Sequence, residues 1–155
     1  MFLMVPVVAL LCNMVLMTGV SEIEVPQEII EITDEVGGKY AICPELLQTI
    51  CYTESRFQTD AYNSGCYGVM QINPRWHQER MDKLGVTNIC DMGSNILVGT
   101  DYLAELLREY GDIEVALMVY HGEQNAVERV RNGQTSGYAE EILQISANLE
   151  RIHGK

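Results

Sequence analysis

The positions of the hydrophobic residues predict a chain of short helices. A first amphipathic helix is expected after Pro26, because apolar residues recur there every three or four positions, and the pair Gly37 and Gly38 is expected to end it. A second helix is expected to begin at Pro44, since proline is tolerated in the first turn of a helix. Its apolar stripe consists of Leu46, Leu47, Ile50 and Cys51.

Three further helices are predicted in the second half of the chain, each after a residue that can cap a helix. Ser94, Asp112 and Ser136 are the expected N-caps, because their side-chain oxygens can accept hydrogen bonds from the free N–H groups of a first turn. Gly111 is expected to end the first of these three helices. Helical spacing therefore accounts for most of the chain after residue 26.

The helical pattern is interrupted from residue 57 to residue 74, where turn-forming residues are frequent. Within this stretch Val69, Gln71 and Ile72 are expected in a short strand or extended segment. The sequence thus predicts a mostly α fold (α+β) with a small irregular or β insertion, and its 155 residues predict one domain. Sheet-rich and Rossmann-type folds are not supported, since strands and helices do not alternate along the chain.

The net charge of −12 argues against a nucleic-acid-binding protein, because such proteins need a basic surface to neutralise phosphates. Six acidic residues and no basic ones lie between Glu22 and Glu35. We interpret residues 21–35 as an acidic spacer that includes the start of the first helix, and residues 36–155 as the globular domain.

Residues 1–20 are expected to take the chain across a membrane. The segment from Phe2 to Val20 is almost wholly apolar, and no Lys or Arg precedes Lys39. A cleaved signal peptide is favoured by the small residues around Gly19, whereas an uncleaved membrane anchor is favoured by the length of the segment. Both alternatives remain open, and both predict an extracytoplasmic protein that is secreted or associated with a membrane.

One charged residue is expected on an apolar helical face. Glu54 follows Leu47 by seven positions, Ile50 by four and Cys51 by three, so it shares their face of the helix. Burial would raise the pKa of its carboxyl and keep it protonated, as an acid catalyst of glycoside cleavage requires. The alternative is that Glu54 turns to solvent at the end of the helix.

Four motifs in order along the chain resemble those of soluble lytic transglycosylases (SLT type). Residues 43–57 end in the Glu-Ser-x-Phe pattern of the catalytic helix, and residues 68–72 are similar to the Gly-Leu-Met-Gln motif. Residues 95–103 match Asn-Ile-x-x-Gly-x-x-Tyr-Leu, and residues 116–122 resemble the segment Ala-Leu-x-x-Tyr-Asn. The resemblance covers roughly residues 26–150 and implies a lysozyme-like helical fold.

The resemblance also implies site residues. Glu54 would be the catalytic acid/base, Tyr120 would hydrogen-bond near its carboxyl, and Gly99 would allow tight helix packing. The expected substrate-binding residues are Ser55, Met70, Gln71, Tyr120, His121 and Tyr138. Two positions depart from the family pattern, which has Asn where this chain has His121 and Gly where it has Glu123.

The implied reaction is cleavage of the β-1,4 bond between N-acetylmuramic acid and N-acetylglucosamine in peptidoglycan glycan strands, giving 1,6-anhydromuramoyl products. The implied enzyme is a lyase that acts as a monomer without a cofactor. A goose-type lysozyme is the alternative, but its expected second carboxylate is Asn73 here, which leaves Asp60 and Glu79 as other bases. A non-catalytic wall-binding module is a further alternative.

Four cysteines remain after the leader: Cys43, Cys51, Cys66 and Cys90. In an exported chain they predict at least one disulfide. The pair Cys51–Cys66 is preferred if residues 68–71 lie near Glu54. The spacing of His and Cys residues does not indicate a metal site.

Overall fold

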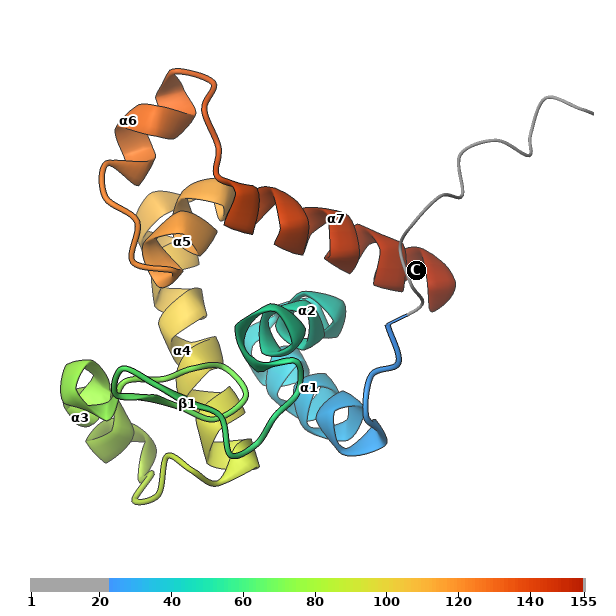
Figure 1. The fold of residues 1–155 in the computed structure, drawn as a ribbon, viewed down its shortest axis with the longest axis vertical. Helices are drawn as coiled ribbons and strands as arrows, with labels where there is room; N and C mark the ends of the chain where they lie inside the picture. The colour runs from blue at the N-terminus through green and yellow to red at the C-terminus, as the bar shows by residue number, and fades with distance from the viewer. Residues whose placement is uncertain (1–22, 155) are drawn as a thin grey trace, which may run out of the picture.

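The computed structural model describes residues 23–154 and shows a mostly α protein (Figure 1), which confirms the predicted fold class. The leader assigned to residues 1–20 lies outside the described residues. The helices are α1 (Gln27–Tyr40), α2 (Pro44–Ser55), α3 (Pro74–Leu84), α4 (Met92–Tyr110), α5 (Ile113–Tyr120), α6 (Ala126–Arg131) and α7 (Gly137–Ile152). A small antiparallel hairpin of β1 (Tyr62–Asn63) and β2 (Cys66–Tyr67) lies between α2 and α3.

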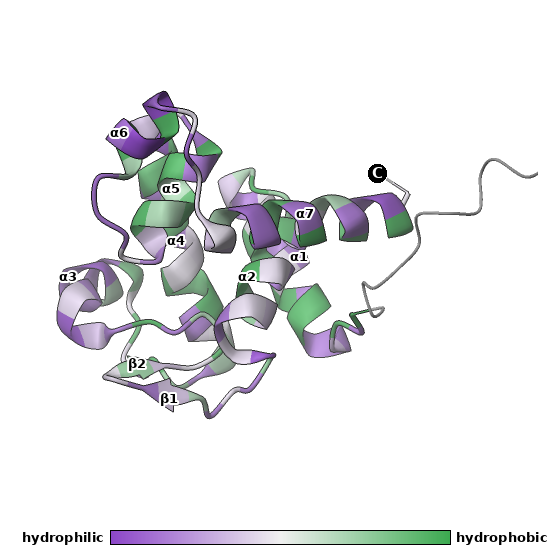
Figure 2. Ribbon diagram, turned by 45° about the horizontal axis from the view of Figure 1, so that its top comes forward, coloured by the Kyte–Doolittle hydropathy of each residue, from purple (hydrophilic) through white to green (hydrophobic). Residues whose placement is uncertain are grey.

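Helix α2 lies at the centre of the molecule, packed against α1 on one side and α7 on the other (Figure 1). Helix α4 contacts α1, α3 and α5, and so joins the hairpin side of the molecule to the α5–α6 side. In Figure 2, α5 is coloured mainly hydrophobic and α7 alternates between hydrophobic and hydrophilic residues, as expected for a central and a peripheral helix. Between residues 23 and 154, no helix is long and apolar enough to cross a membrane.

The predicted capping residues are largely confirmed. The side chain of Asp112 accepts hydrogen bonds at the start of α5, that of Ser136 accepts one at the start of α7, and Gly111 ends α4 in a left-handed conformation. The prediction was wrong for α4, where Asp91 rather than Ser94 is the N-cap. The Asp91 carboxylate accepts from the backbone N–H of Ser94, so the helix begins three residues earlier than expected.

The prediction that Gly37 and Gly38 end the first helix was also wrong. Helix α1 continues to Tyr40 and ends at Ala41, which adopts a left-handed conformation with φ of 54°. Gly37 has a packing role instead, since a Cβ atom there would lie 2.7 Å from the carbonyl oxygen of Ile42. The absence of a side chain allows α1 to approach the loop that leads into α2.

The structure differs from the prediction in one extended segment and in two additional helices. Ile72 forms one antiparallel bridge with Tyr67, but the residues between them form turns rather than the expected strand. Helix α3 follows at once and was not predicted, although Asn73 and Pro74 form an N-cap followed by a first-turn proline. The short helix α6 was not predicted either; its N-cap residue, Asn125, has no side-chain capping bond.

The predicted disulfide is not formed, because Cys43, Cys51, Cys66 and Cys90 are all free thiols. Cys51 is fully buried on α2, and the thiol of Cys43 donates a hydrogen bond to Glu45 over 2.9 Å. Burial is the largest cause that raises the pKa of Cys51, and it raises the pKa of Cys43 to about 11. Both therefore behave as neutral, structural thiols rather than as disulfide partners.

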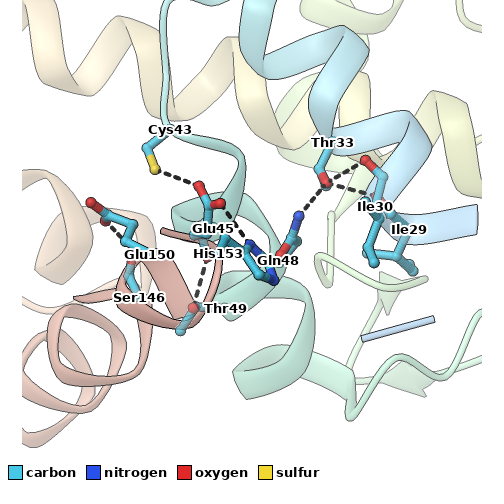
Figure 3. A network of polar contacts seen from close by, with 10 residues as sticks. All are labelled: Ile29, Ile30, Thr33, Cys43, Glu45, Gln48, Thr49, Ser146, Glu150 and His153. Carbon is cyan, nitrogen blue, oxygen red and sulfur yellow. Dashed lines mark hydrogen bonds and ion pairs between the residues drawn. The ribbon is translucent and has the colours of Figure 1, made fainter. Parts of the chain in front are cut away.

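A buried polar network joins the N-terminal end of α2 to the end of α7 (Figure 3). Glu45, whose side chain is 1% exposed, lies 2.8 Å from Nδ1 of His153, and the thiol of Cys43 contacts its other oxygen. On the neighbouring side, Gln48 donates to the hydroxyl of the buried Thr33 on α1. These bonds compensate for the desolvation of a carboxylate inside the helical core.

Candidate active site

Glu54 lies in the last turn of α2, where the chain turns away from the helix. Arg56 and Phe57 both adopt left-handed conformations with φ of 54° and 64°, and the N–H of Phe57 donates to the carbonyl of Cys51. This turn ends the helix directly after Glu54 and leads the chain toward the β-hairpin. The Glu54 side chain is 15% exposed, which confirms that it shares the apolar face and retains a small contact with solvent.

Two side chains from the C-terminal half of the chain face the Glu54 carboxyl. The hydroxyl of Tyr138, in the first turn of α7, donates a hydrogen bond of 2.6 Å to Oε1 of Glu54. Nδ1 of His121, at the end of α5, lies 4.0 Å from the same oxygen. The two rings are stacked, with centroids 3.9 Å apart and planes 16° from parallel.

The environment of Glu54 favours the protonated acid. Burial is the largest influence and raises the pKa of its carboxyl above the ordinary value, while the Tyr138 hydrogen bond and the charge of His121 lower it in part. Burial and the nearby Glu54 raise the pKa of Tyr138, so its hydroxyl remains a donor throughout the neutral range. Glu54 can thus deliver a proton and be stabilised by Tyr138 after losing it.

The loop after β2 lies against Glu54 and is fixed by Asn95 of α4. The fully buried Asn95 side chain accepts a hydrogen bond of 2.8 Å from the N–H of Met70 and donates to the carbonyls of Tyr67 and Ile89. Gly68 is required at this contact, because its φ is 74° and a Cβ atom would lie 2.5 Å from Nδ2 of Asn95. Asn95 therefore determines the conformation of the loop.

Tyr120 lies in this arrangement but contacts a different group from the one expected. Its hydroxyl donates to the carbonyl of Met70 over 3.0 Å, and Tyr138 is the residue bonded to Glu54. Gly99 permits this arrangement, since a Cβ atom there would lie 2.7 Å from the Met70 sulfur and 3.0 Å from the Tyr120 hydroxyl. The packing role expected for Gly99 is thereby confirmed.

Two expected sugar-binding residues lie beneath the site. Ser55 is buried and its hydroxyl is within 3.0 Å of the carbonyls of Cys51 and Val69. Met70 is fully buried. These buried side chains support the loop, and their expected contact with a glycan stays a prediction.

Gln71 keeps a partly exposed position in a strained conformation. Its φ is 49°, and its side-chain amide donates to the carbonyls of Gly68, over 2.9 Å, and Ala61. Left-handed backbone at a residue other than glycine is found preferentially at functional sites. The amide N–H groups stabilise the loop, while the partial exposure leaves Gln71 near the surface beside Met70.

The positions considered for a second catalytic base are Asn73, Asp60 and Glu79. Asn73, in place of the expected aspartate, accepts from the N–H of Arg75 and so caps α3. Asp60 is exposed, and Glu79 is an exposed residue paired with Lys83 on α3. Within residues 23–154, no group of three or more His, Cys, Asp or Glu side chains is arranged to hold a metal ion.

The sequence indicated Glu54 but neither its bond to Tyr138 nor the contacts of Asn95, Arg129 and Asp91. Asn95 was noted only as part of a motif, although a buried Asn beside a close-packed glycine is a signal for backbone hydrogen bonding. Arg129 donates to Glu123 over 2.6 Å and to the carbonyl of Thr135, which joins the loops on either side of α6. No spacing in the sequence indicates the contacts of Arg129, so only the fold reveals them.

Comparison with known families matches residues 31–143 to the transglycosylase SLT domain. A transglycosylase of Enterobacteria phage PRD1 is 34% identical over 96 residues, which are 61% of this chain and 35% of the phage protein. The chain thus spans about a third of the length of that relative. Proteins named X polypeptide, from Escherichia coli and from its strain K12, are 28% and 27% identical over 132 residues, which are 78% of this chain and 75% of each of them.

Among solved structures, the chain is similar to an inactive mutant of the lytic transglycosylase Slt from Pseudomonas aeruginosa. The TM-score is 0.67 at 18% sequence identity, and the match covers 83% of this chain and 25% of the other. This likeness confirms the expected lysozyme-like helical fold.

Proposed function

The chain belongs to the transglycosylase SLT domain family, and from this premise we propose that it is a lytic transglycosylase that cleaves peptidoglycan glycan strands. The observation that carries the proposal is the Glu54 carboxyl, which is largely buried, hydrogen-bonded to Tyr138 and raised in pKa. The phage relative named a transglycosylase and the structural likeness to Slt support the same activity.

In the first step, Glu54 would donate its proton to the oxygen of the β-1,4 bond between N-acetylmuramic acid and N-acetylglucosamine. The bond from C1 to that oxygen breaks, and positive charge develops at C1. The resulting Glu54 carboxylate would be stabilised by the Tyr138 hydroxyl, which already donates to Oε1. Burial raises the pKa of Glu54 and so favours its acid form, and the hydrogen bond limits the cost of giving up the proton.

In the second step, the Glu54 carboxylate would take the proton of the muramic 6-hydroxyl while its oxygen attacks C1. A 1,6-anhydro ring closes, and Glu54 returns to the acid form. Ring closure benefits from the proximity of the attacking oxygen, provided that the sugar is suitably oriented. We propose that Gln71, His121 and Tyr138, which are partly or largely exposed, contact the sugar, and that Tyr120 acts through the Met70 carbonyl.

The rival reaction is hydrolysis, in which a second carboxylate activates water. An inverting hydrolase needs two carboxyls roughly 6.5–9.5 Å apart. Asn73 caps α3 and cannot act as a base, and Glu79 is paired with Lys83, so both positions favour the transglycosylase. A non-catalytic wall-binding module has no use for a buried acid, which disfavours that alternative.

The decisive experiment is the mass of the products released from purified peptidoglycan by wild-type protein and by Glu54→Gln. We expect 1,6-anhydromuramoyl products, which are one water lighter than the hydrolysed form, and their loss in Glu54→Gln. Hydrated products would identify a lysozyme and make Asp60 and Glu79 the first bases to test. A wild-type protein that binds the wall and releases nothing would establish a binding module.

We further propose that residues 1–20 export the protein, as access to peptidoglycan requires. Their apolar length supports this proposal, with a cleaved signal or an anchor as its two forms. A fusion to a reporter enzyme that is active only outside the cytoplasm tests it. Reporter activity should disappear when residues 1–20 are deleted, and activity that persists would contradict the proposal. The mass of the mature protein distinguishes cleavage from anchoring.

A further inference from the structure

Glu54 is accompanied by a second ionisable group, His121. The ring of His121 is stacked on Tyr138, and its Nδ1 lies 4.0 Å from the same carboxyl oxygen that accepts the Tyr138 hydrogen bond. His121 is also the C-terminal cap residue of α5, where the helix dipole favours a positively charged imidazole. It is 48% exposed, so it can exchange protons with solvent while facing the buried acid.

Glu123 is a second acidic residue whose pKa is affected by the charge of His121. Burial alone would raise the pKa of Glu123, but hydrogen bonds from Ser136 and Arg129 and the charges of Arg129 and His121 lower it overall. Glu123 is therefore a carboxylate at neutral pH, and His121 interacts with two acidic groups, Glu54 and Glu123.

Arg129 connects Glu123 to the start of α7, which carries Tyr138. It donates to Glu123 over 2.6 Å and to the carbonyl of Thr135 over 3.0 Å. The next residue, Ser136, caps α7, whose first turn carries Tyr138. The loops before and after α6 are thereby joined, and His121 and Tyr138 are presented to Glu54 as one unit.

We infer that His121, in addition to the sugar contact proposed above, acts through Glu54: its ring lies 4.0 Å from the carboxyl and, as a positive charge, stabilises the carboxylate form during the reaction. The inference rests on the proposed function, in that the reaction alternates Glu54 between acid and carboxylate. His121 does not transfer the proton; Glu54 gives its proton to the leaving oxygen and receives the one from the 6-hydroxyl. The imidazolium lowers the energy of the charged state that lies between these two transfers.

His121 is the group within salt-bridge distance of Glu54 that can carry a positive charge. Among the described residues that face Glu54, burial raises the pKa of Tyr138, Tyr120, Cys51 and Cys66, which keeps all four neutral. The groups facing His121 are Glu54, Glu123 and Tyr138. A change in the charge at His121 therefore acts on Glu54 without competition from these neighbours.

Two substitutions of opposite sign test the inference through activity. His121→Asn removes the charge, so the pKa of Glu54 should rise and the alkaline limb of the kcat profile should move to higher pH. His121→Lys makes the charge permanent and should move that limb to lower pH. We expect shifts of about half a pH unit to one unit, because exposure to solvent reduces the interaction between charges 4.0 Å apart.

His153 supplies a matched control. It is the cap residue at the end of α7, and its Nδ1 lies 2.8 Å from Glu45 at the other end of α2 (Figure 3). His153→Asn should reduce stability and leave the alkaline limb of kcat in place. A merely structural role for His121 predicts the same result for His121→Asn.

A second measurement does not depend on activity. Carbon-13 nuclear magnetic resonance titration of the Glu54 carboxyl should show that His121→Asn raises its midpoint and that His153→Asn leaves it unchanged, because the charge of His121 lowers the pKa of Glu54. An unchanged Glu54 midpoint in His121→Asn, or limbs that fail to move in opposite directions, overturns the inference. Absence of any lytic activity in wild-type protein would instead overturn the proposed function, and the titration would still decide the inference.

Discussion

At the scale of single residues, Glu54 occupies a position that is unfavourable for folding and suited to catalysis. A buried carboxyl with a raised pKa binds protons more tightly in the folded than in the unfolded chain. The folded state therefore loses stability as the pH rises from the ordinary pKa of a glutamate through the raised one, and remains less stable above it. Such a cost is common at active sites, where stability and activity oppose one another.

Glu54→Gln tests this opposition in one variant. Lytic activity should fall by about 10²–10⁴-fold, the usual contribution of acid–base catalysis. The melting temperature at pH 7.5 should nevertheless exceed that of wild-type protein, because the glutamine has no charge to bury, and the gain should vanish toward pH 4. Thermal melts at both pH values check this, and a variant that is less stable at pH 7.5 would contradict the assigned burial of Glu54.

Tyr138→Phe separates the hydrogen bond from the ring stacking at the same position. The variant keeps the ring on His121 and loses the 2.6 Å bond to Glu54. We expect kcat to fall by about ten- to a hundred-fold, since a hydrogen bond to a charged group contributes about 1.5–3 kcal/mol. Tyr110→Phe, at the far end of α4, is the control and should retain full kcat; equal losses in both variants would indicate a general effect on the fold.

At the scale of elements, the sequence predicted the helices that carry strong local signals. Asp112, Ser136, Pro44 and Gly111 each have a local role in starting or ending a helix, and their chemistry can be read without the fold. Gly37 was misread because its role is the close approach of the chain at Ile42, five residues later, whose N–H donates to the Gly37 carbonyl. A glycine near the end of a helix can thus serve packing there without ending the helix.

The site shows the same division. The sequence indicated Glu54 through its helical face and a motif. It did not indicate that Tyr138, rather than Tyr120, bonds to Glu54. The Tyr120 hydroxyl lies over Gly99 and reaches the Met70 carbonyl, a contact between three segments of the chain. Hydrophobic periodicity predicts which face of a helix a residue lies on, but not where its hydroxyl group points. The hydrogen-bond partners of Tyr120 and Tyr138 could therefore be assigned only from the structure.

The conformation of the loop after β2 depends on hydrogen bonds from Asn95 of α4. Asn95→Ala would leave the N–H of Met70 and the carbonyl of Ile89 without their partner, while the carbonyl of Tyr67 would keep its bond from the N–H of Ile72. We expect the free energy of unfolding to fall by about 2–4 kcal/mol, because each buried polar group left unpaired costs about 1–3 kcal/mol and some can relax. Urea unfolding measures the change.

The control for Asn95→Ala is Asn88→Ala in the same region of the chain. Asn88 is exposed and its side chain accepts one hydrogen bond, from the N–H of Cys90. We expect a much smaller loss of stability in this variant, because water can replace the lost partner. Comparable losses in the two variants would contradict the role assigned to Asn95.

At the scale of the whole molecule, one cation joins the helices around α4. Arg80 of α3 pairs with Asp101 and Glu105 of α4, and Asp101 also accepts a hydrogen bond of 2.9 Å from Tyr40 of α1. The Arg80 side chain is 13% exposed, and its guanidinium lies 5.3 Å from the centre of the Tyr102 ring. The chain has 22 acidic and 10 basic residues, and this one basic side chain pairs with two of the acidic residues.

Arg80→Ala should therefore destabilise the molecule as a whole. Removal of one partner from a largely buried ion pair leaves the other charge uncompensated, which costs about 3–5 kcal/mol in fully buried cases. We expect about 2 kcal/mol here, because Glu105 remains half exposed to solvent. Lys83→Ala is the matched control on the same helix: both Lys83 and its partner Glu79 are exposed, so no measurable change in the free energy of unfolding is expected. If urea unfolding gave the two variants equal stability, the connection of α1, α3 and α4 through Arg80 would not be the stabilising contact that its geometry indicates.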